Sequence, residues 1–256
     1  MKDLQTAERV SHTDVSDNYV YQRSLLAYLK AAELVSGNVL EIGTGSGYGV
    51  EVLAPKANQL TTIDKFSNNI DFSFYDNVTF RQMNVPPFAG IDDDQFDFVV
   101  SFQVIEHIED DHAFVAEIHR VLKPGGKFIV TTPNIKMSLT RNPWHVREYT
   151  ISELDNLLRE KFSDVEKLGV FGNDKIMKYY ENNRKSVEKI TRWDIFNLQY
   201  KLPRRILQIP YDILNRRNRK KLVAQDNSLV ASIKKEDYAI RAAEASCFDL
   251  FYVATK

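Results

Sequence analysis

The sequence predicts an α/β fold in which seven mostly parallel strands form a doubly wound sheet. Asn38 to Ile42 is a short apolar run with β-branched residues, typical of a strand buried on both faces, and a glycine turn follows it. Further strand-like runs alternate with helix-like segments up to residue 132, which implies parallel strands joined by right-handed crossovers. At 256 residues the chain is long enough for one such domain with an insertion.

Glycines at alternate positions, Gly43, Gly45 and Gly47, make the turn after the first strand. Glycine lets the chain turn sharply and lets a ligand lie directly against the backbone. Glu41 stands just before the turn, where a carboxylate would repel a pyrophosphate but could face an ammonium or sulfonium group. The glycine pattern alone is also compatible with a tight turn that binds no ligand.

The remaining elements follow in order along the chain. A polar arm precedes a helix from Asn18 to Leu34, which Gly37 ends. A short helix is expected after the glycine turn, with Val50, Leu53 and Ala54 at helical spacing and Pro55 as its limit. Further helices are expected from Asp111 to Leu122 and from Ile151 to Phe162, the latter with Thr150 or Ser152 as its cap. The later strands are expected within Leu60–Asp64, Val78–Met83, Phe96–Phe102, Lys127–Thr132, Phe162–Phe171 and Phe248–Ala254.

Three segments carry a family resemblance that covers roughly residues 20–135. They are Glu-Ile-Gly-Thr-Gly-Ser-Gly from residue 41, Val-Ile-Glu-His-Ile from residue 104 and Leu-Lys-Pro-Gly-Gly from residue 122. In this order they resemble the class I S-adenosylmethionine-dependent methyltransferases. The resemblance implies a Rossmann-like sheet and an enzyme that binds S-adenosyl-L-methionine and releases S-adenosyl-L-homocysteine.

The resemblance also implies which residues hold the cofactor. Asp64 at the end of the second strand is expected to accept hydrogen bonds from the ribose hydroxyls. Asn84 departs from the aspartate that the family often has there, and Arg23 either pairs with the methionine carboxylate or is simply solvated. The expected cofactor residues are Glu41, Gly43, Thr44, Gly45, Gly47, Asp64, Lys65, Asn84, Val85, Phe102, Tyr21 and Arg23.

The expected catalytic residues are His145, His107 and Glu148. A hydroxyl acceptor needs a nearby base, and histidine is suited by its near-neutral pKa. His145 is either this base, oriented by Glu148, or a residue that orders its loop; His107 is a supporting residue or a packing residue. No metal-ligand cluster stands out in the sequence, so no essential metal is expected.

Residues 142–149 resemble a segment of some small-molecule and sugar O-methyltransferases, and within it Trp144, Arg147 and Tyr149 are expected to bind the substrate. The sequence therefore predicts methylation of a hydroxyl on a small molecule or glycan. Methylation of an amine or carboxylate is one alternative, and a non-catalytic cofactor-binding partner subunit is another. Nucleic acid is disfavoured, because Ser101 to Val104 lacks the Asn/Asp-Pro-Pro-aromatic motif of the nucleic-acid amino-methyltransferases.

Residues 173–235 form a basic insertion between the sixth and seventh strands, with 16 Lys/Arg against 6 Asp/Glu. We expect either a helical cap over the substrate, or a surface that recruits an anionic membrane or a lipid-linked substrate. As a cap it would turn Ile206, Ile209, Ile213 and Leu214 inward, and Pro203 and Pro210 would prevent one long helix. The predicted division is 1–36 (arm and helix covering the cofactor), 37–172 (core), 173–235 (insertion) and 236–256 (final strand).

The bulk composition limits location and partners. The net charge of −1 gives no overall field that favours nucleic acid. Cys247 is the single cysteine, which excludes an internal disulfide framework and fits a reducing compartment. The N-terminus lacks a signal-peptide pattern. A cytoplasmic protein is therefore expected, and the basic insertion adds the alternative of a peripheral position at the inner membrane surface. The oligomeric state is left open.

Overall fold

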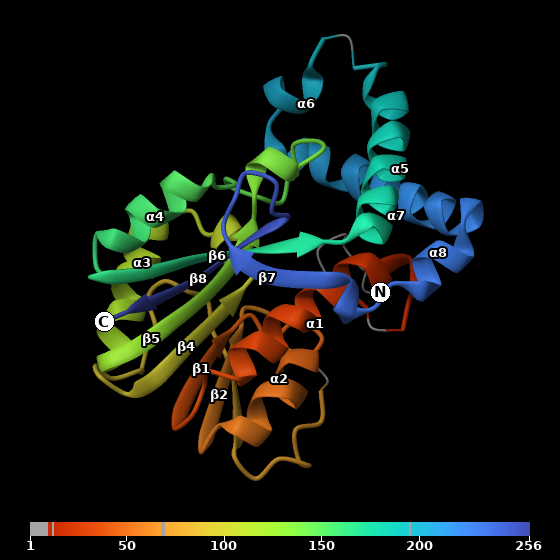
Figure 1. The fold of residues 1–256 in the computed structure, drawn as a ribbon. Helices are drawn as coiled ribbons and strands as arrows, with labels where there is room; N and C mark the ends of the chain where they lie inside the picture. Colours follow the sequence, from red (N-terminus) through yellow and green to blue (C-terminus); the bar gives the residue numbers. More distant parts are fainter. Residues whose placement is uncertain (1–9, 12, 68–69, 195) are drawn as a thin grey trace.

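The computed structural model describes residues 10, 11, 13–67, 70–194 and 196–256, so most of the predicted N-terminal arm lies outside the described residues. One sheet runs through the molecule in the order β3-β2-β1-β4-β5-β8-β6-β7 (Figure 1). Its strands are β1 Asn38–Ile42, β2 Gln59–Asp64, β3 Val78–Gln82, β4 Phe96–Phe102, β5 Leu122–Pro133, β6 Asp164–Gly172, β7 Tyr238–Ala242 and β8 Asp249–Thr255.

The first five strands are parallel, while β8 runs antiparallel to β5 and β6, and β7 runs antiparallel to β6. The doubly wound, mostly parallel sheet is therefore confirmed. The expected count of seven strands was one too few, because Tyr238–Ala242 pairs along β6 at the edge of the sheet. A short edge strand with one paired side and mostly exposed residues leaves little apolar pattern to detect.

Helices cover both faces of the sheet. The helices are α1 Asn18–Ala32, α2 Tyr48–Leu53, α3 Asp111–Val121, α4 Ile151–Arg159, α5 Asp174–Thr191, α6 Leu198–Lys201, α7 Arg204–Gln225 and α8 Asn227–Ser232. Short 3-10 helices are η1 Val15–Asp17, η2 Ala54–Lys56, η3 Ile105–His107, η4 Ile135–Met137 and η5 Lys235–Asp237. Thr150 caps α4 as expected, in a reciprocal pair of hydrogen bonds with Glu153.

Neighbouring residues of each central strand belong to two different cores. Leu40 and Val99 pack on the side covered by α3 and α4, whereas Val39 and Val100 pack on the side covered by α1 and α2 (Figure 1). This alternation follows from the period of two in a strand, and burial of both faces explains the continuous apolar runs in the sequence.

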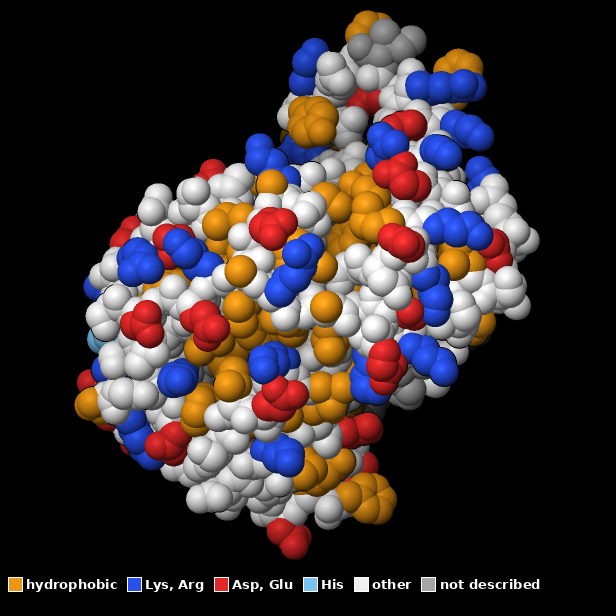
Figure 2. Space-filling model, in the orientation of Figure 1, with side chains coloured by type: hydrophobic (Ala, Val, Ile, Leu, Met, Phe, Trp, Pro, Cys, Tyr) orange, Lys and Arg blue, Asp and Glu red, His pale blue; other side chains and the backbone are white. Residues whose placement is uncertain are grey.

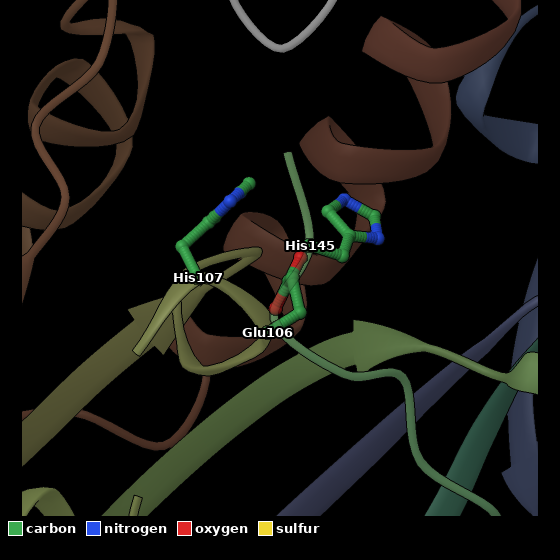
Figure 3. A group of neighbouring side chains, drawn as sticks. All are labelled: Glu106, His107 and His145. Carbon is green, nitrogen blue, oxygen red and sulfur yellow. The ribbon is translucent and has the colours of Figure 1, made fainter. Parts of the chain in front are cut away.

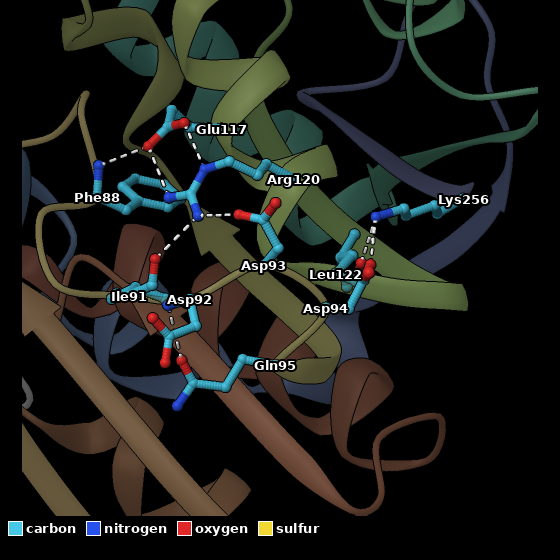
Figure 4. Close-up of polar contacts among 10 residues, drawn as sticks. All are labelled: Phe88, Ile91, Asp92, Asp93, Asp94, Gln95, Glu117, Arg120, Leu122 and Lys256. Carbon is cyan, nitrogen blue, oxygen red and sulfur yellow. Dashed lines mark hydrogen bonds and ion pairs between the residues drawn. The ribbon is translucent and has the colours of Figure 1, made fainter.

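A polar network joins α3 to the loop before β4 (Figure 4). The Arg120 guanidinium donates to Glu117, to the Asp93 carboxylate at 2.7 Å and to the Ile91 carbonyl at 2.9 Å. Glu117 in turn accepts from the Phe88 backbone N–H at 2.8 Å. These charge-assisted bonds raise the pKa of Arg120 and lower that of Glu117, and they fix the loop away from the ligand edge of the sheet.

The insertion is helical, as expected, but α7 contradicts two details of the prediction. It continues for 22 residues through Pro210, so Pro210 does not divide it. Pro203, by contrast, lies between α6 and α7 and separates the two helices, as expected. Pro210 removes one intrahelical hydrogen bond, a loss that packing of the helix against α5 and η1 compensates.

The inward orientation expected for Ile206, Ile209 and Ile213 is also wrong, because these side chains are 60%, 70% and 50% exposed. Leu214 is 45% exposed but lines a cavity beneath the insertion, as expected. Leu222 and Asn218 occupy the buried stripe of α7 instead. Arg216 and Arg219 turn toward the core, where both pair with the fully buried Asp17 carboxylate at 2.8 and 2.6 Å. A buried carboxylate needs such partners, and this requirement sets the rotation of the helix. Among the described residues, no helix is long and apolar enough to cross a membrane.

Candidate active site

The glycine turn and the end of β2 form one unit at the carboxyl edge of the sheet. Gly43, Gly45 and Gly47 all have positive φ angles, of 94°, 56° and 87°. The Gly45 N–H donates to Asp64 Oδ2 at 3.0 Å, and Asp64 Oδ1 accepts from the Phe66 N–H at 2.9 Å. The carboxylate therefore orders both the glycine turn and the loop that follows its own strand.

The shape of the turn leaves room for a ligand against the backbone. A Cβ at Gly43 would stand 2.5 Å from Val104 Cγ2, and one at Gly47 would stand 2.7 Å from Ile70 Cδ1. At Gly45, by contrast, the nearest atom would lie 3.9 Å away, and the residue is exposed. Glycines at 43 and 47 thus close the turn, while Gly45 presents its bare backbone to an incoming molecule.

Glu41 lies fully buried beneath this turn. Its Oε2 accepts from the Thr62 hydroxyl at 2.6 Å, and Thr62 also contacts the Thr44 hydroxyl at 2.7 Å. Burial raises the pKa of Glu41 to about 7, against the opposing effect of its hydrogen bonds. A cationic ligand group at this edge would favour the ionised carboxylate.

One residue of this region was missed by sequence reasoning. A Cβ at Gly49, in the first turn of α2, would stand 2.3 Å from Tyr28 Cε1 and 2.4 Å from Glu41 Oε1. Gly49 therefore lets α1 and the Glu41 carboxylate approach α2. The signal was present as a fourth glycine at the same alternate spacing, beyond the three that form the turn.

The other expected cofactor residues occupy different surroundings. Lys65 and Asn84 are exposed and Val85 is half-buried, all just past the ends of β2 and β3. Phe102 is buried, with its ring 4.7 Å from that of Tyr28. Lys65 and Asn84 thus lie at the carboxyl edge of the sheet, whereas Phe102 is part of the core. Their contacts with the cofactor stay predictions.

The two expected cofactor residues of α1 pack against other side chains. The Tyr21 ring lies 5.3 Å from that of Tyr48. Arg23 Nε is 2.8 Å from Asp249 Oδ2, and both side chains are largely buried. Burial raises the pKa of Asp249, and Arg23 opposes that shift. Any role of Arg23 toward the methionine carboxylate, which stays a prediction, would therefore compete with this ion pair.

The N-terminal arm reaches both the glycine turn and the insertion. The Ser46 hydroxyl donates to the Val10 carbonyl at 3.2 Å, and Asp17 holds Arg216 and Arg219 of α7. The described residues Val10 and Asp17 thus contact two different regions, and the proposed division at residues 36 and 173 cuts through these contacts.

His145 and Glu148 form a hydrogen-bonded pair in the segment after β5. His145 Nδ1 lies 2.7 Å from Glu148 Oε1, and the two side chains are 9% and 10% exposed. Glu148 also accepts from the Ser138 hydroxyl. On the other side of the ring, His145 Nε2 lies 2.9 Å from Asn142 Nδ2. The structure thus brings together the two residues that the sequence paired as base and orienting carboxylate.

His107 and Glu106 approach His145 from the segment after β4 (Figure 3). The His107 and His145 rings are 5.0 Å apart and nearly perpendicular, and His107 Nδ1 is 3.1 Å from the Trp144 carbonyl. Glu106 accepts from the Thr132 hydroxyl at 2.9 Å. One ligand atom from each of Glu106, His107 and His145 lies within 4.8 Å of the others.

A metal ion would have to fit among contacts that these side chains already make, because Glu106 accepts from the Thr132 hydroxyl and His107 Nδ1 lies 3.1 Å from the Trp144 carbonyl. Moreover, the His145 ring already contacts Glu148 through one nitrogen and Asn142 through the other. The expectation of no essential metal therefore stays a prediction.

A cavity of about 480 Å³ lies between the segment after β5 and the insertion. His145, Glu148 and Asn142 line it from the core, together with Tyr19 of α1 and Pro133 at the end of β5. Leu207, Tyr211 and Leu214 of α7 line it from the insertion, as do Val187 and Ile190 of α5. Its volume suits a small organic molecule or a sugar unit.

The three expected substrate residues do not line this cavity. Arg147 and the Tyr149 hydroxyl both contact Asp111 Oδ2, at 2.6 and 2.7 Å, and so join the segment to the start of α3. The Trp144 indole N–H donates to Asp212 of α7 at 3.0 Å. These contacts give all three residues a structural role, and substrate binding by them stays a prediction.

The chain belongs to a methyltransferase-domain family, whose model matches residues 16–162. A probable S-adenosylmethionine-dependent methyltransferase from Mycolicibacterium smegmatis is 38% identical over 175 residues, 65% of this chain and 68% of that protein. A ubiquinone biosynthesis O-methyltransferase from Xanthomonas oryzae is 31% identical over 116 residues, 43% of this chain and 48% of that protein.

Among solved structures, a possible histamine N-methyltransferase from Thermotoga maritima has a TM-score of 0.53. It is 16% identical, with 93% of this chain and 91% of that chain covered, a likeness that shows the fold alone. The family and these relatives confirm the predicted methyltransferase class, its Rossmann-like fold and S-adenosylmethionine as the cofactor.

Proposed function

We propose that this methyltransferase moves the methyl group of S-adenosylmethionine to a hydroxyl of a small molecule or glycan. The observation that carries the proposal is the largely buried His145–Glu148 pair in the wall of the 480 Å³ cavity. The cofactor, once bound, supplies a methyl group activated by its sulfonium. The chain has to hold the hydroxyl in line with that methyl group and take its proton.

The hydrogen bonds around His145 define its tautomer. Asn142 Oδ1 accepts from the Trp144 backbone N–H at 3.0 Å, which makes the Asn142 amide nitrogen the donor toward His145 Nε2. His145 Nε2 is therefore the acceptor, and Nδ1–H donates to Glu148. An acceptor hydroxyl that takes the place of the Asn142 amide would meet an unprotonated nitrogen.

Glu148 supports the same role. When Nε2 takes the hydroxyl proton, the ring becomes an imidazolium, and the adjacent carboxylate stabilises the new charge. In a site this buried, that stabilisation is stronger than in water. His107, whose ring meets that of His145 nearly at right angles, is the supporting residue in this arrangement.

A panel of methyl acceptors tests the proposal. The protein would be incubated with S-adenosylmethionine labelled in its methyl group and with sugars, phenols, primary amines and carboxylic acids in parallel. We expect label in base-stable ethers of the hydroxyl compounds. Label in amines or in base-labile esters only would overturn the hydroxyl assignment and favour one of the alternatives. The Xanthomonas relative, by its name, methylates oxygen, which supports the expected result.

A further inference from the structure

Large apolar side chains are exposed along residues 193–213 of the insertion. This group, which we call the insertion tip, consists of Trp193, Phe196, Tyr200, Ile206, Ile209 and Ile213, each at least half exposed. Trp193, Phe196 and Ile209 reach 74%, 71% and 70%. Such a concentration on one short segment is unusual for a surface that faces only water.

Basic residues lie between these apolar residues along the chain and on either side of them. Arg192, Lys201, Arg205 and Arg217 are all exposed. Figure 2 shows hydrophobic side chains at the upper end of the molecule with Lys and Arg side chains around them. Aromatic residues mixed with lysine and arginine are the composition of segments that lie in the headgroup region of a bilayer.

The cavity wall and the insertion tip use the same stretches of the chain. Ile190, Leu198 and Leu214 line the cavity, and their exposed fractions are 37%, 45% and 45%. Leu198 stands between Phe196 and Tyr200, and Leu214 directly follows Ile213. Partly exposed residues of the cavity wall thus alternate along the chain with residues of the insertion tip.

We propose that the insertion tip docks on an anionic lipid bilayer and turns the cavity mouth toward the lipid. The basic residues would be attracted to the negative headgroups, and the isoleucines of α7 would be buried where the headgroup region meets the acyl chains. A second copy of this chain fits less well, because two tips of the same positive charge repel each other. Single-stranded nucleic acid would use the aromatic rings but would leave Ile206, Ile209 and Ile213 in water.

The acceptor class follows from the position of the mouth, and this step rests on the proposed function. An acceptor that reaches the cavity from the bilayer would carry its hydroxyl on a polar head and an apolar chain behind it. Ile190 and Leu198, partly exposed in the cavity wall, would contact that chain, while the hydroxyl approaches His145 in the same cavity.

Cosedimentation with vesicles tests the docking without any acceptor. The full-length protein would be mixed with vesicles of phosphatidylcholine alone or with added phosphatidylglycerol, at low and high salt. We expect binding to the anionic vesicles that weakens as salt rises. Arg205→Glu and Arg217→Glu should each weaken it about fivefold or more. Trp193→Ser with Ile209→Asp should weaken it about tenfold or more.

Matched controls come from other exposed parts of the chain. Phe74→Ser removes an 84% exposed ring, and Lys56→Glu reverses an exposed charge, both far along the chain from the insertion. Neither should change vesicle binding. Absence of binding at low salt overturns the docking. So does equal loss in the controls, tighter binding to single-stranded RNA than to vesicles, or self-association that the Trp193→Ser, Ile209→Asp variant abolishes.

A second measurement tests the acceptor class separately. Calorimetry would compare dodecyl maltoside, below its micelle concentration, with maltose. We expect the alkyl compound to bind at least about tenfold tighter, with the difference lost in Ile190→Asp, Leu198→Asp. Equal affinities would overturn the amphiphilic acceptor while the vesicle result still decides the docking. A failure of hydroxyl methylation itself would appear only in the acceptor panel.

Discussion

The cofactor edge and the cavity are built by different means. At the cofactor edge, backbone groups of Gly43, Gly45 and Gly47 form the surface, and Glu41 and Asp64 come from adjacent strand ends. The cavity is walled by side chains from separate regions of the chain, chiefly the segment after β5 and the insertion, with Tyr19 of α1. A turn therefore fixes the cofactor edge locally, whereas the cavity exists only while the insertion stays docked.

Removing the buried carboxylate that docks α7 should have the largest effect. Asp17→Ala leaves Arg216 and Arg219 without their shared partner in a buried site, which costs about 3–5 kcal/mol of unfolding free energy. Chemical denaturation would measure the loss. Lys30→Ala, which breaks an exposed pair with Glu33, should cost about 0–1 kcal/mol. Similar losses in both variants would contradict the claim that this contact holds the insertion.

Loss of the Asp64 carboxylate should weaken cofactor binding at the carboxyl edge of the sheet. Asp64→Ala removes acceptors for the Gly45 and Phe66 N–H groups and, by prediction, for the ribose hydroxyls. We expect affinity for S-adenosylhomocysteine to fall by about 1–3 kcal/mol in calorimetry. The double change Ile206→Ser, Ile213→Ser on the outer face of α7 should leave this affinity unchanged. A normal affinity in Asp64→Ala would remove the residue from the cofactor site.

The raised pKa of Glu41 predicts how pH affects the same edge. Its pKa of about 7 exceeds the ordinary value of 4.5, so the folded protein without cofactor holds a proton that the unfolded chain releases. Stability from this group is thus present at low pH and is lost as pH rises from about 4.5 to 7.

The cationic cofactor should reverse that preference by favouring the ionised carboxylate. Affinity should rise about tenfold for each pH unit up to about 7, with proton release on binding. Calorimetry in buffers of different ionisation enthalpy would count the proton. In Glu41→Gln both the pH dependence of cofactor affinity and the proton release on binding should disappear. A pH dependence that persists in this variant would come from another titratable group and would contradict the assignment to Glu41.

The smallest effect is expected from metal removal. Treatment with a chelator should leave turnover within about twofold, because the proposed mechanism uses His145 with its partner Glu148 and needs no metal ion. Activity assays before and after dialysis against chelator, with zinc or magnesium restored, would measure it. A large loss that one metal restores would instead make Glu106, His107 and His145 a metal site.

The sequence predicted best where a pattern is local. The strand before the glycine turn, the whole of β4 and the Thr150 cap follow from runs of a few residues, and the structure has them at those positions. The pairing of His145 with Glu148 was also accessible, because the two residues are three positions apart within one segment.

What the sequence could not predict depends on distant partners. The rotation of α7 is set by Asp17, some 200 residues earlier, and no local pattern in α7 signals that contact. For the same reason the sequence could not predict the hydrogen bonds of Arg147 and Tyr149 with Asp111, or that of Trp144 with Asp212. Strand β7 was not predicted because it is defined by its pairing with β6 and not by an apolar pattern of its own.

The central claim is that His145 is the base for the acceptor hydroxyl, and single-turnover methyl transfer in His145→Ala tests it most directly. With S-adenosylmethionine saturating, we predict a rate about 100-fold or more below wild type, partly restored by added imidazole, and an unchanged cofactor affinity. A wild-type rate on a hydroxyl acceptor, or a loss that imidazole leaves untouched and that weaker cofactor binding explains, would contradict the claim.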